Sequence, residues 1–143
     1  MAEDSTTPDL IELSRRQFAA AKRHDADAVL SNYVPDAVWD LSDAGMGVFE
    51  GVAAIRAFFE DWWGTWGEHV VELEEVADLG HGVMFSRVHE YARLAGSDGH
   101  VEQRRGWITL WARGEKIERV TVYLDIDKAR AVAERLAQER ADG

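Results

Sequence analysis

The sequence predicts a single α+β domain over residues 1–143, with helices first and a curved antiparallel sheet after them. Apolar residues recur at helical spacing in the N-terminal half, whereas from His69 onward they alternate with a period of two. Short glycine-containing segments separate the strand-like stretches, which favours antiparallel neighbours. A chain of 143 residues supports one core of ordinary size but not two.

The N-terminal segment is predicted to form a loose tail and two helices. Residues 1–7 are polar and form the tail. Thr7 and Pro8 then provide a capping hydroxyl and a proline at the first helical position, which is a common start for an amphipathic helix. A second helix begins at Asp25. Pro35 ends it, because the proline ring cannot join the helical hydrogen-bond ladder.

A short strand, a loop and a long helix come next. Residues 37–41 are branched and aromatic, as strand residues often are, and residues 42–51 contain three glycines and are predicted as a loop. Residues 52–66 give the clearest helical pattern in the chain. One face of this helix carries an unbroken apolar stripe, formed by Ile55, Phe58, Phe59, Trp62 and Trp66.

Four strands and a last helix complete the predicted order. The strands cover residues 71–76, 82–94, 101–112 and 116–124. An aspartate, Asp125 or Asp127, is expected to cap the closing helix.

The charge balance argues against several classes of partner. The formal net charge is −11 and no run of Lys or Arg interrupts it, so nucleic acid and anionic membranes are not expected partners. No apolar run approaches the roughly 20 residues that span a bilayer, cysteine is absent, and the N-terminus does not resemble a signal peptide, so we expect a cytoplasmic protein. The five histidines lack metal-ligand spacing, and no metal site is expected.

Three segments of the chain resemble a known family. Residues 51–59 read Gly-Val-Ala-Ala-Ile-Arg-Ala-Phe-Phe, and residues 35–40 read Pro-Asp-Ala-Val-Trp-Asp. Tyr123-Leu124-Asp125 precedes the last helix. Together these segments are similar to the SnoaL-like branch of the nuclear-transport-factor-2-like, or ketosteroid-isomerase-like, superfamily. The resemblance covers about residues 10–135.

The resemblance implies a cone-shaped barrel. In such a fold a strongly curved, mainly antiparallel sheet wraps around three N-terminal helices, an extra helix follows at the C-terminus, and a pocket lies at the open end. It also implies a small hydrophobic organic ligand, no cofactor, and a homodimer joined through the outer sheet face. The superfamily contains isomerases, cyclases, hydrolases, dehydratases and catalytically silent binders, so the fold does not fix the function.

The aromatic residues favour a pocket wall or an interface. The chain has six tryptophans, and a tryptophan presents a large apolar body with one hydrogen-bond donor. Trp39, together with Phe58, Phe59 and Trp62 of the apolar stripe, is predicted to line the ligand pocket. Plain filling of the core is the competing interpretation for any one of them.

Asp40 is the first candidate for a catalytic base. The resemblance implies this role, because ketosteroid-isomerase-like relatives carry a general base shortly after the Asp-Ala-x-Val segment. An apolar setting would raise the pKa of such a carboxyl group toward the working range. Here the acid comes one residue early, and a shift of one residue on a strand reverses the side-chain face. The competing interpretation is a strand-end acid that accepts hydrogen bonds from loop N–H groups.

The second candidate site lies on a hairpin. A three-residue loop at 97–99 would place His89 opposite Trp107 and Arg87 opposite Thr109, on one face of two neighbouring strands. The opposite face of the same strands is more apolar. Which of the two faces lines the pocket is left open by the sequence.

Each residue of this hairpin has two interpretations. His89 suits a base near neutral pH or a structural hydrogen bond. Arg87 and Arg105 can anchor an anionic ligand or pair with glutamates across the sheet. The resemblance places a proton-donating acid at the position of Trp107, but an indole donates only a hydrogen bond, which argues against steroid-isomerase chemistry. Trp107 is instead predicted to bind the ligand, its N–H polarising the ligand oxygen.

Tyr123 and Asp125 alternate on the last strand and are the remaining candidates. Tyr123 is predicted to hold a ligand carbonyl. The resemblance to SnoaL-like cyclases gives Asp125 a possible role as base, while capping of the C-terminal helix is the competing interpretation.

Two function classes follow, and one observation distinguishes them. The first is cofactor-free proton transfer on a hydrophobic carbonyl compound, of the isomerase or cyclase type. The second is a non-catalytic binder of a small apolar ligand, and a dimeric interaction module without a cavity is a weaker third. A carboxylate or an imidazole inside a closed apolar cavity favours catalysis, whereas a cavity with only amides, indoles and arginines favours binding.

Overall fold

The fold is known from a computed structural model that describes residues 9–112 and 114–143. The predicted tail at 1–7 and the predicted helix start at Thr7 and Pro8 lie outside the described residues. Within them the chain forms one α+β unit. The described residues form four α-helices and one short 3-10 helix: α1 (Leu10–Lys22), α2 (Ala26–Leu30), η2 (Ser42–Ala44), α3 (Val52–Thr65) and α4 (Ile126–Asp142).

Six strands form one mixed sheet in the order β2-β1-β6-β5-β4-β3. Their bounds are β1 (Tyr33–Asp40), β2 (Val48–Glu50), β3 (Trp66–Asp78), β4 (Val83–Leu94), β5 (His100–Ala112) and β6 (Lys116–Tyr123). All neighbouring strands are antiparallel except β1 and β6, which run parallel. The strongly curved, mainly antiparallel sheet is as expected, but it does not close into the expected cone-shaped barrel, because its edge strands β2 and β3 do not pair with each other.

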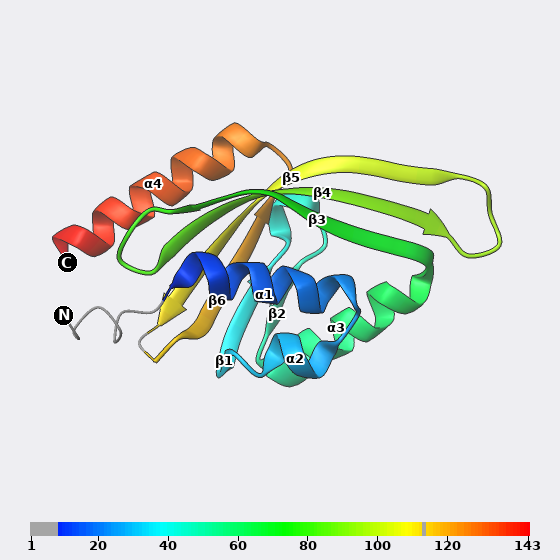
Figure 1. Cartoon of the computed structure of the whole chain (residues 1–143), viewed down its shortest axis with the longest axis horizontal. Coiled ribbons are helices and arrows are strands. Elements are labelled where there is room, and N and C mark those ends of the chain that lie inside the picture. Colours follow the sequence, from blue (N-terminus) through cyan, green and yellow to red (C-terminus); the bar gives the residue numbers. More distant parts are fainter. Residues whose placement is uncertain (1–8, 113) are drawn as a thin grey trace.

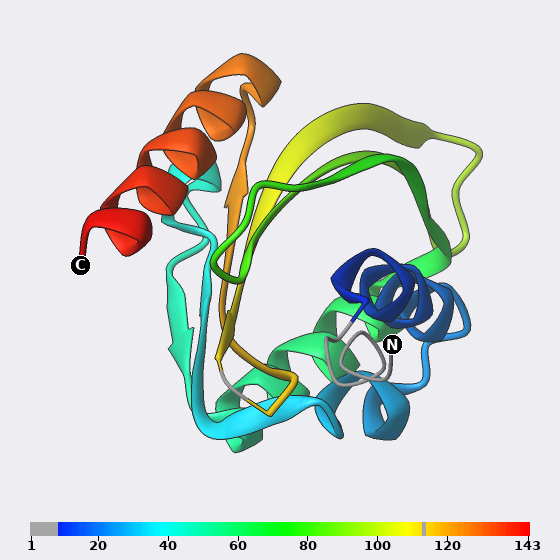
Figure 2. The same ribbon diagram turned by 60° about the vertical axis from the view of Figure 1, so that its left-hand side comes forward.

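The bent sheet has a concave and a convex face, and helices cover both. Figures 1 and 2 show α1, α2 and α3 inside the concave face and α4 across the convex face. Aspartates cap three of these helices by accepting a hydrogen bond from a backbone N–H: Asp9 for α1, Asp25 for α2 and Asp125 for α4. The caps expected at Asp25 and Asp125 are confirmed.

The segment between α2 and α3 differs from the prediction. The helix that begins at Asp25 ends at Leu30, and Pro35 lies inside β1 instead of stopping a helix. The proline is tolerated because the pairing of β1 with β6 is irregular between Tyr33 and Val38, so no ladder hydrogen bond is lost there. The predicted loop at 42–51 contains β2, which forms a short antiparallel pair with the end of β1.

The register of the β4–β5 hairpin also differs, and this difference reverses the expected faces. Arg93 pairs with His100, so the loop between the strands is longer than three residues, and Gly96 rather than Gly99 has a positive φ, of 75°. Trp107 consequently lies opposite Ser86, not opposite His89. Because the observed register differs from the predicted one by an odd number of residues, Trp107 and His89 point to opposite faces of the sheet.

The convex face is divided between α4 and charged side chains. Helix α4 packs its alanines Ala129, Ala133 and Ala137 against Phe85 and other apolar residues of β4 and β5. The part of this face that α4 leaves uncovered on β3, β4 and β5 carries ion pairs, among them Arg104 with Glu74. The expected homodimer through the outer sheet face stays a prediction.

We expect Gly106→Ala to destabilise the fold. Gly106 lies on β5 directly under α4, and a Cβ added there would overlap the methyl group of Ala129. Overpacking of this kind costs about 1–3 kcal/mol. The matched control is Gly64→Ala in the exposed last turn of α3, where an added Cβ meets open space. This substitution is expected to raise stability by about 0.5–1 kcal/mol, because alanine favours the helix over glycine. Urea unfolding of both variants measures the two changes, and equal stability of G106A and the wild type would contradict the close packing of α4.

Candidate functional site

A cavity lies between the concave face of the sheet and the helices α1 and α3. Its free space is about 90 Å³. Most of its wall is apolar, and the polar groups come from a few positions on α1, β1, β3, β4 and β5. The lining residues are Gln17, Phe18, Ala21, Val29, Tyr33, Trp39, Leu41, Met46, Phe58, Phe59, Trp62, Trp63, His69, Val71, Val88, Glu90, Arg105, Trp107, Thr109, Ile117, Val120 and Val122.

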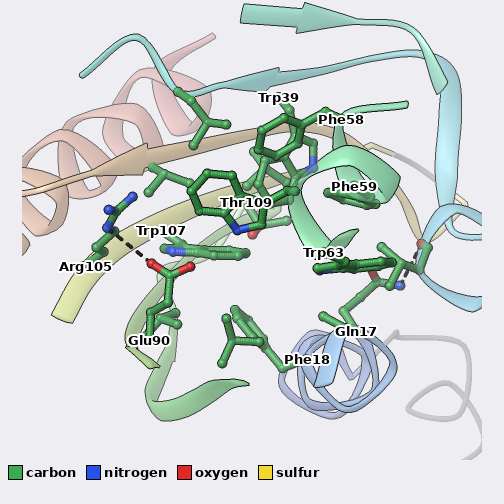
Figure 3. Close-up of a pocket in the computed structure, with 18 of the residues that line it drawn as sticks. Gln17, Phe18, Trp39, Phe58, Phe59, Trp63, Glu90, Arg105, Trp107 and Thr109 are labelled. Carbon is green, nitrogen blue, oxygen red and sulfur yellow. Dashed lines mark hydrogen bonds and ion pairs between the residues drawn. The ribbon is translucent and has the colours of Figure 1, made fainter. Parts of the chain in front are cut away.

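Aromatic rings form a connected wall around this space. Trp39 packs edge-on against both Trp107 and Phe59, with ring centroids 5.2 and 5.1 Å apart. Phe59 in turn stacks on Trp63, and Phe18 of α1 contacts Trp107 from the other side. Figure 3 shows these five rings around the pocket. Rings that support one another in this way keep their rotamers, so the wall is preformed.

Strand register brings three charged or titratable side chains together inside the apolar wall. Glu90 on β4 has Val71 of β3 as its direct neighbour, which makes His69 a diagonal neighbour on the same face. On the other side Arg105 of β5 lies opposite Val88 and is likewise diagonal to Glu90. All three side chains are largely buried, with 4% of His69 and 14% each of Glu90 and Arg105 exposed.

His69 and Glu90 form the closest polar contact in the cavity. The Nε2 atom of His69 lies 2.7 Å from Oε2 of Glu90 and 3.1 Å from the indole Nε1 of Trp62. One ring nitrogen cannot donate to a carboxylate and accept from an indole at once. The shorter, charged contact decides the assignment: Nε2 carries the hydrogen and donates it to Glu90, and the Trp62 N–H approaches without a true acceptor. Nδ1 of His69 is buried and has no partner among the described residues.

Glu90 is held in its ionised form. Burial alone raises the pKa of this carboxyl group, but the hydrogen bond from His69 and the positive charge of Arg105 outweigh burial, so that the pKa lies below its usual value of 4.5. Arg105 contributes charge without a hydrogen bond, because its Nε lies 3.7 Å from Oε1 of Glu90. The carboxylate is therefore an acceptor that orients His69, and it is a weak base itself.

A buried tyrosine adds a further polar group at the opposite side of the cavity. The hydroxyl oxygen of Tyr33 accepts a hydrogen bond of 2.8 Å from the indole of Trp39. Burial raises the pKa of Tyr33 well above its usual value, so the phenol keeps its proton. That proton is available to donate to a ligand.

The family can be assigned once this geometry is known. The model of the SnoaL-like domain matches residues 14–120, about three quarters of the chain. The chain belongs to the SnoaL-like domain family. None of the curated proteins compared with the chain matches it in sequence. The family assignment agrees with the resemblance seen at residues 35–40 and 51–59.

Solved structures share the fold of this SnoaL-like domain at low sequence identity. An NTF2-like protein from Burkholderia pseudomallei is 14% identical, with 89% of this chain and 98% of that chain covered and a TM-score of 0.72. A protein from Catenulispora acidiphila with a ketosteroid-isomerase-like fold, solved with trimethylamine, is 14% identical over 88% and 92% of the chains, with a TM-score of 0.69. A Mycobacterium tuberculosis protein solved with estradiol-17β-hemisuccinate is 18% identical over 82% and 94%, with a TM-score of 0.68. At these identities the comparisons establish the NTF2-like α+β fold.

Six of the eleven residues predicted for the site line the cavity of the SnoaL-like domain. They are Trp39, Phe58, Phe59, Trp62, Arg105 and Trp107. The apolar stripe of α3 supplies three of them, as its spacing indicates. Arg105 contacts Glu90 across the sheet, which is the competing interpretation given for it above.

Asp40 lies outside the cavity. It follows Trp39 on β1, and because Trp39 points inward, the alternation of strand side chains turns Asp40 to the other face. There it accepts hydrogen bonds from the backbone N–H and hydroxyl of Ser42 and from Arg119. Burial raises the pKa of Asp40, but the hydrogen bonds from Ser42 and the positive charge of Arg119 outweigh burial, so the pKa lies below its usual value. This is the arrangement of a strand-end acid that fixes a turn.

His89 and Arg87 lie on the convex face, because of the corrected register. His89 pairs with Glu102 at 2.8 Å and Arg87 with Glu74 at 3.3 Å. Neither lines the cavity. The expected grouping of both residues with Trp107 on one face is therefore wrong.

Tyr123 and Asp125 also lie outside the cavity. Tyr123 packs against the residues that α4 covers, and the ammonium group of Lys128 lies 5.4 Å from the centre of its ring. Asp125 accepts a hydrogen bond from the backbone N–H of Lys128 and so caps α4. Both residues stabilise the start of α4 rather than facing the cavity.

Sequence reasoning missed His69, Glu90 and Tyr33. Glu90 had a usable signal: it is the single charged residue on a β4 face that otherwise carries Met84, Ser86, Val88 and Ala92. A lone acid on an apolar strand face indicates a buried charge that needs a partner. His69 gave no such signal, because its partner lies on another strand. Tyr33 was placed in a helix.

The described residues contain neither a cluster suited to a metal ion nor a helix suited to a membrane. Among residues 9–112 and 114–143, no group of three or more His, Cys, Asp or Glu side chains is arranged to hold a metal ion. Within the same part of the chain, no helix is long and apolar enough to cross a membrane.

We expect the stability gained from Glu90 to depend on pH. The pKa of Glu90 is lower in the folded than in the unfolded state, so its ionisation stabilises the fold above about pH 4.5 and this contribution is lost as the pH falls through the folded pKa. Glu90→Gln should therefore cost about 1–2 kcal/mol at pH 7 and progressively less below pH 4.5. Urea unfolding of both proteins between pH 3 and 7 measures the difference.

The matched control for this measurement is Glu102→Gln. Oε2 of Glu102 lies 2.8 Å from Nε2 of His89 on the convex face, and exposed ion pairs contribute about 0–1 kcal/mol. A cost for E90Q that is as small as for E102Q, or that does not change with pH, would contradict the assignment of Glu90 as a buried carboxylate.

Proposed function

We propose that this SnoaL-like domain binds a small, mostly apolar carbonyl compound and moves a proton at the carbon next to the carbonyl group, without a cofactor. One observation carries the proposal. A histidine with a free ring nitrogen is held by a buried carboxylate inside a cavity whose other walls are aromatic and aliphatic. An imidazole and a carboxylate in a closed apolar cavity favour catalysis over plain binding.

His69 would act as the general base. Its Nε2–H donates to Glu90, which leaves the lone pair on Nδ1 to accept a proton. In the first step the C–H bond next to the carbonyl breaks, its proton moves to Nδ1, and its electron pair forms an enolate whose charge lies on the oxygen. In the second step the imidazolium gives a proton back to the substrate and becomes neutral again. Delivery to another atom isomerises the substrate, and delivery to the same carbon after the Nδ1 proton has exchanged with solvent yields hydrogen exchange.

Glu90 would act by positioning and by charge. A carboxylate that accepts from one ring nitrogen fixes the orientation of the imidazole and stabilises the imidazolium that forms. Its lowered pKa suits this role, because it makes Glu90 a weaker base than an ordinary carboxylate and keeps it ionised beside the imidazole. Asp40, the base expected from the resemblance, has its pKa lowered and lies outside the cavity.

A non-catalytic binder with the same cavity is the second candidate. The aromatic wall supports it, because rings around a small cavity supply affinity without any chemistry. Two fold relatives were solved with trimethylamine and with an estradiol derivative, and both ligands are small organic molecules. Bound ligand without proton exchange would favour this candidate.

The proposal is tested with acetophenone, whose methyl protons lie next to a carbonyl group. In D₂O the wild type should accelerate the replacement of these protons by deuterium, which ¹H NMR measures as loss of the methyl signal. His69→Gln should slow the catalysed exchange by about 100-fold or to the rate in buffer, since a general base contributes about 10² to 10⁴. Glu90→Gln should slow it less.

The control is His89→Gln. His89 pairs with a glutamate at nearly the same distance as His69 does, 2.8 Å against 2.7 Å, but on the convex face. H89Q should exchange at the wild-type rate. Exchange no faster than in buffer for the wild type, or equal rates for H69Q and the wild type, would exclude His69 as a base.

A further inference from the structure

Two N–H donors in the cavity have no acceptor among the described protein groups. They are the indole Nε1 of Trp107 and Nε of Arg105, and both are buried. The nearest acceptor to Arg105 is Oε1 of Glu90, at 3.7 Å, which is too long for a hydrogen bond. A buried donor without an acceptor destabilises the free protein, so a ligand that supplies an acceptor oxygen forms hydrogen bonds that the free protein lacks.

The two donors are placed to act together. Arg105 and Trp107 are two residues apart on β5, and their side chains point to the same face. Figure 3 shows both of them beside Glu90, with the rings of Phe59 and Trp63 on the other side of the space. A ligand lying between would have its polar end at β5 and its apolar body against α3.

The charged acceptor of the cavity, Glu90, is already satisfied, whereas Nδ1 of His69 has no partner among the described residues and is the proposed base. Glu90 accepts from His69 and faces the positive charge of Arg105. A cationic ligand such as an amine would compete with these partners and would still leave the Trp107 and Arg105 donors without an acceptor. An anionic ligand would use the donors but would bring a second negative charge next to Glu90. A neutral carbonyl oxygen accepts from both donors and brings no charge next to Glu90.

The size of the cavity narrows the ligand further. A cavity of about 150 Å³ is known to bind benzene, and the free space here is about 90 Å³. A compound with one ring already requires small shifts of the wall side chains, and a compound with four fused rings would require the aromatic wall to separate.

We infer that the ligand of this cavity is a neutral compound of about one ring whose carbonyl oxygen accepts hydrogen bonds from Trp107 Nε1–H and Arg105 Nε–H. The inference rests on the proposed function and specifies its substrate class. In the proton-transfer step the same two donors face the oxygen on which the negative charge develops. Tyr33, whose proton is also free, lies on β1 at the far side of the cavity.

The experiment compares four ligands of nearly equal shape. Acetophenone carries a neutral carbonyl, benzoate a carboxylate, 1-phenylethylamine an ammonium group, and isopropylbenzene no polar group. Titrations followed by tryptophan fluorescence and by calorimetry should give the tightest binding for acetophenone, by about tenfold or more over isopropylbenzene, because a hydrogen bond from the neutral Trp107 indole and one from the charged Arg105 guanidinium both contribute. Equal affinity for these two, or tightest binding of benzoate or of the amine, would overturn the inference.

Variants locate the donors. Trp107→Phe keeps an aromatic ring and removes the N–H, and Arg105→Met keeps the length of the side chain and removes the guanidinium. Each should weaken acetophenone binding by about fivefold and leave isopropylbenzene binding unchanged. Trp111→Phe is the matched control, since Trp111 is a buried indole of β5 that does not line the cavity. Tyr33→Phe should leave the preference for acetophenone unchanged. If Y33F lost this preference, the carbonyl oxygen would lie at β1 instead, and the assignment would be overturned.

A measurement on the wild type avoids any folding defect of these variants. In ¹⁵N-labelled protein, the indole N–H signal of Trp107 should move downfield when acetophenone is added and should not do so with isopropylbenzene. Binding and proton exchange are separate readouts. His69→Gln should keep the preference for acetophenone while it loses proton exchange. If His69 is not the base, the inference on the ligand still stands. If proton exchange does not depend on Trp107 and Arg105, only the inference on the ligand is overturned.

Discussion

The structure depends on how a negative charge is kept inside an aromatic cavity. Glu90 is surrounded by apolar side chains and remains ionised because His69 donates a hydrogen bond to it and Arg105 places a positive charge nearby. Removing one partner of a buried ion pair destabilises the fold, because the remaining charge is left without compensation. This constraint couples three neighbouring strands: a slip of one residue in β3 or in β5 would turn His69 or Arg105 to the convex face and leave Glu90 alone.

The large elements of this fold could be predicted from the sequence, and the elements set by long-range pairing could not. The stripe from Ile55 to Trp66 identified α3 and three cavity residues, because helical periodicity is a local property. Pro35 was read as a helix stop because a proline has the same local meaning in a helix and in an irregular strand. Only the irregular pairing of β1 with β6 makes it acceptable in a strand, and that pairing joins residues far apart in the chain.

The candidate site was harder to predict, because it depends on one hairpin loop. The three-residue loop at 97–99 and the observed longer loop both contain glycines, serine and aspartate, and nothing in their composition decides between them. The choice nevertheless decides which face of β4 and β5 lines the cavity. The shorter loop brings His89 to Trp107, and the observed register brings Glu90 to Arg105 instead. Because side chains alternate between the two faces, an odd shift in register matches every residue of the strand with residues of the wrong face on its partner strand.

The two histidine–glutamate pairs show why position on the sheet matters more than residue type. His69 with Glu90 and His89 with Glu102 have nearly the same separation and share the β3–β4–β5 part of the sheet. The side chain of Glu102 is 53% exposed, so water screens its charge, whereas Glu90 acts across an apolar interior. Only the inner pair lies beside unpaired donors and aromatic rings that can hold a substrate. The chemistry proposed for this SnoaL-like domain therefore arises from the concave face as a whole, since the same two residue types on the convex face form an ordinary surface ion pair.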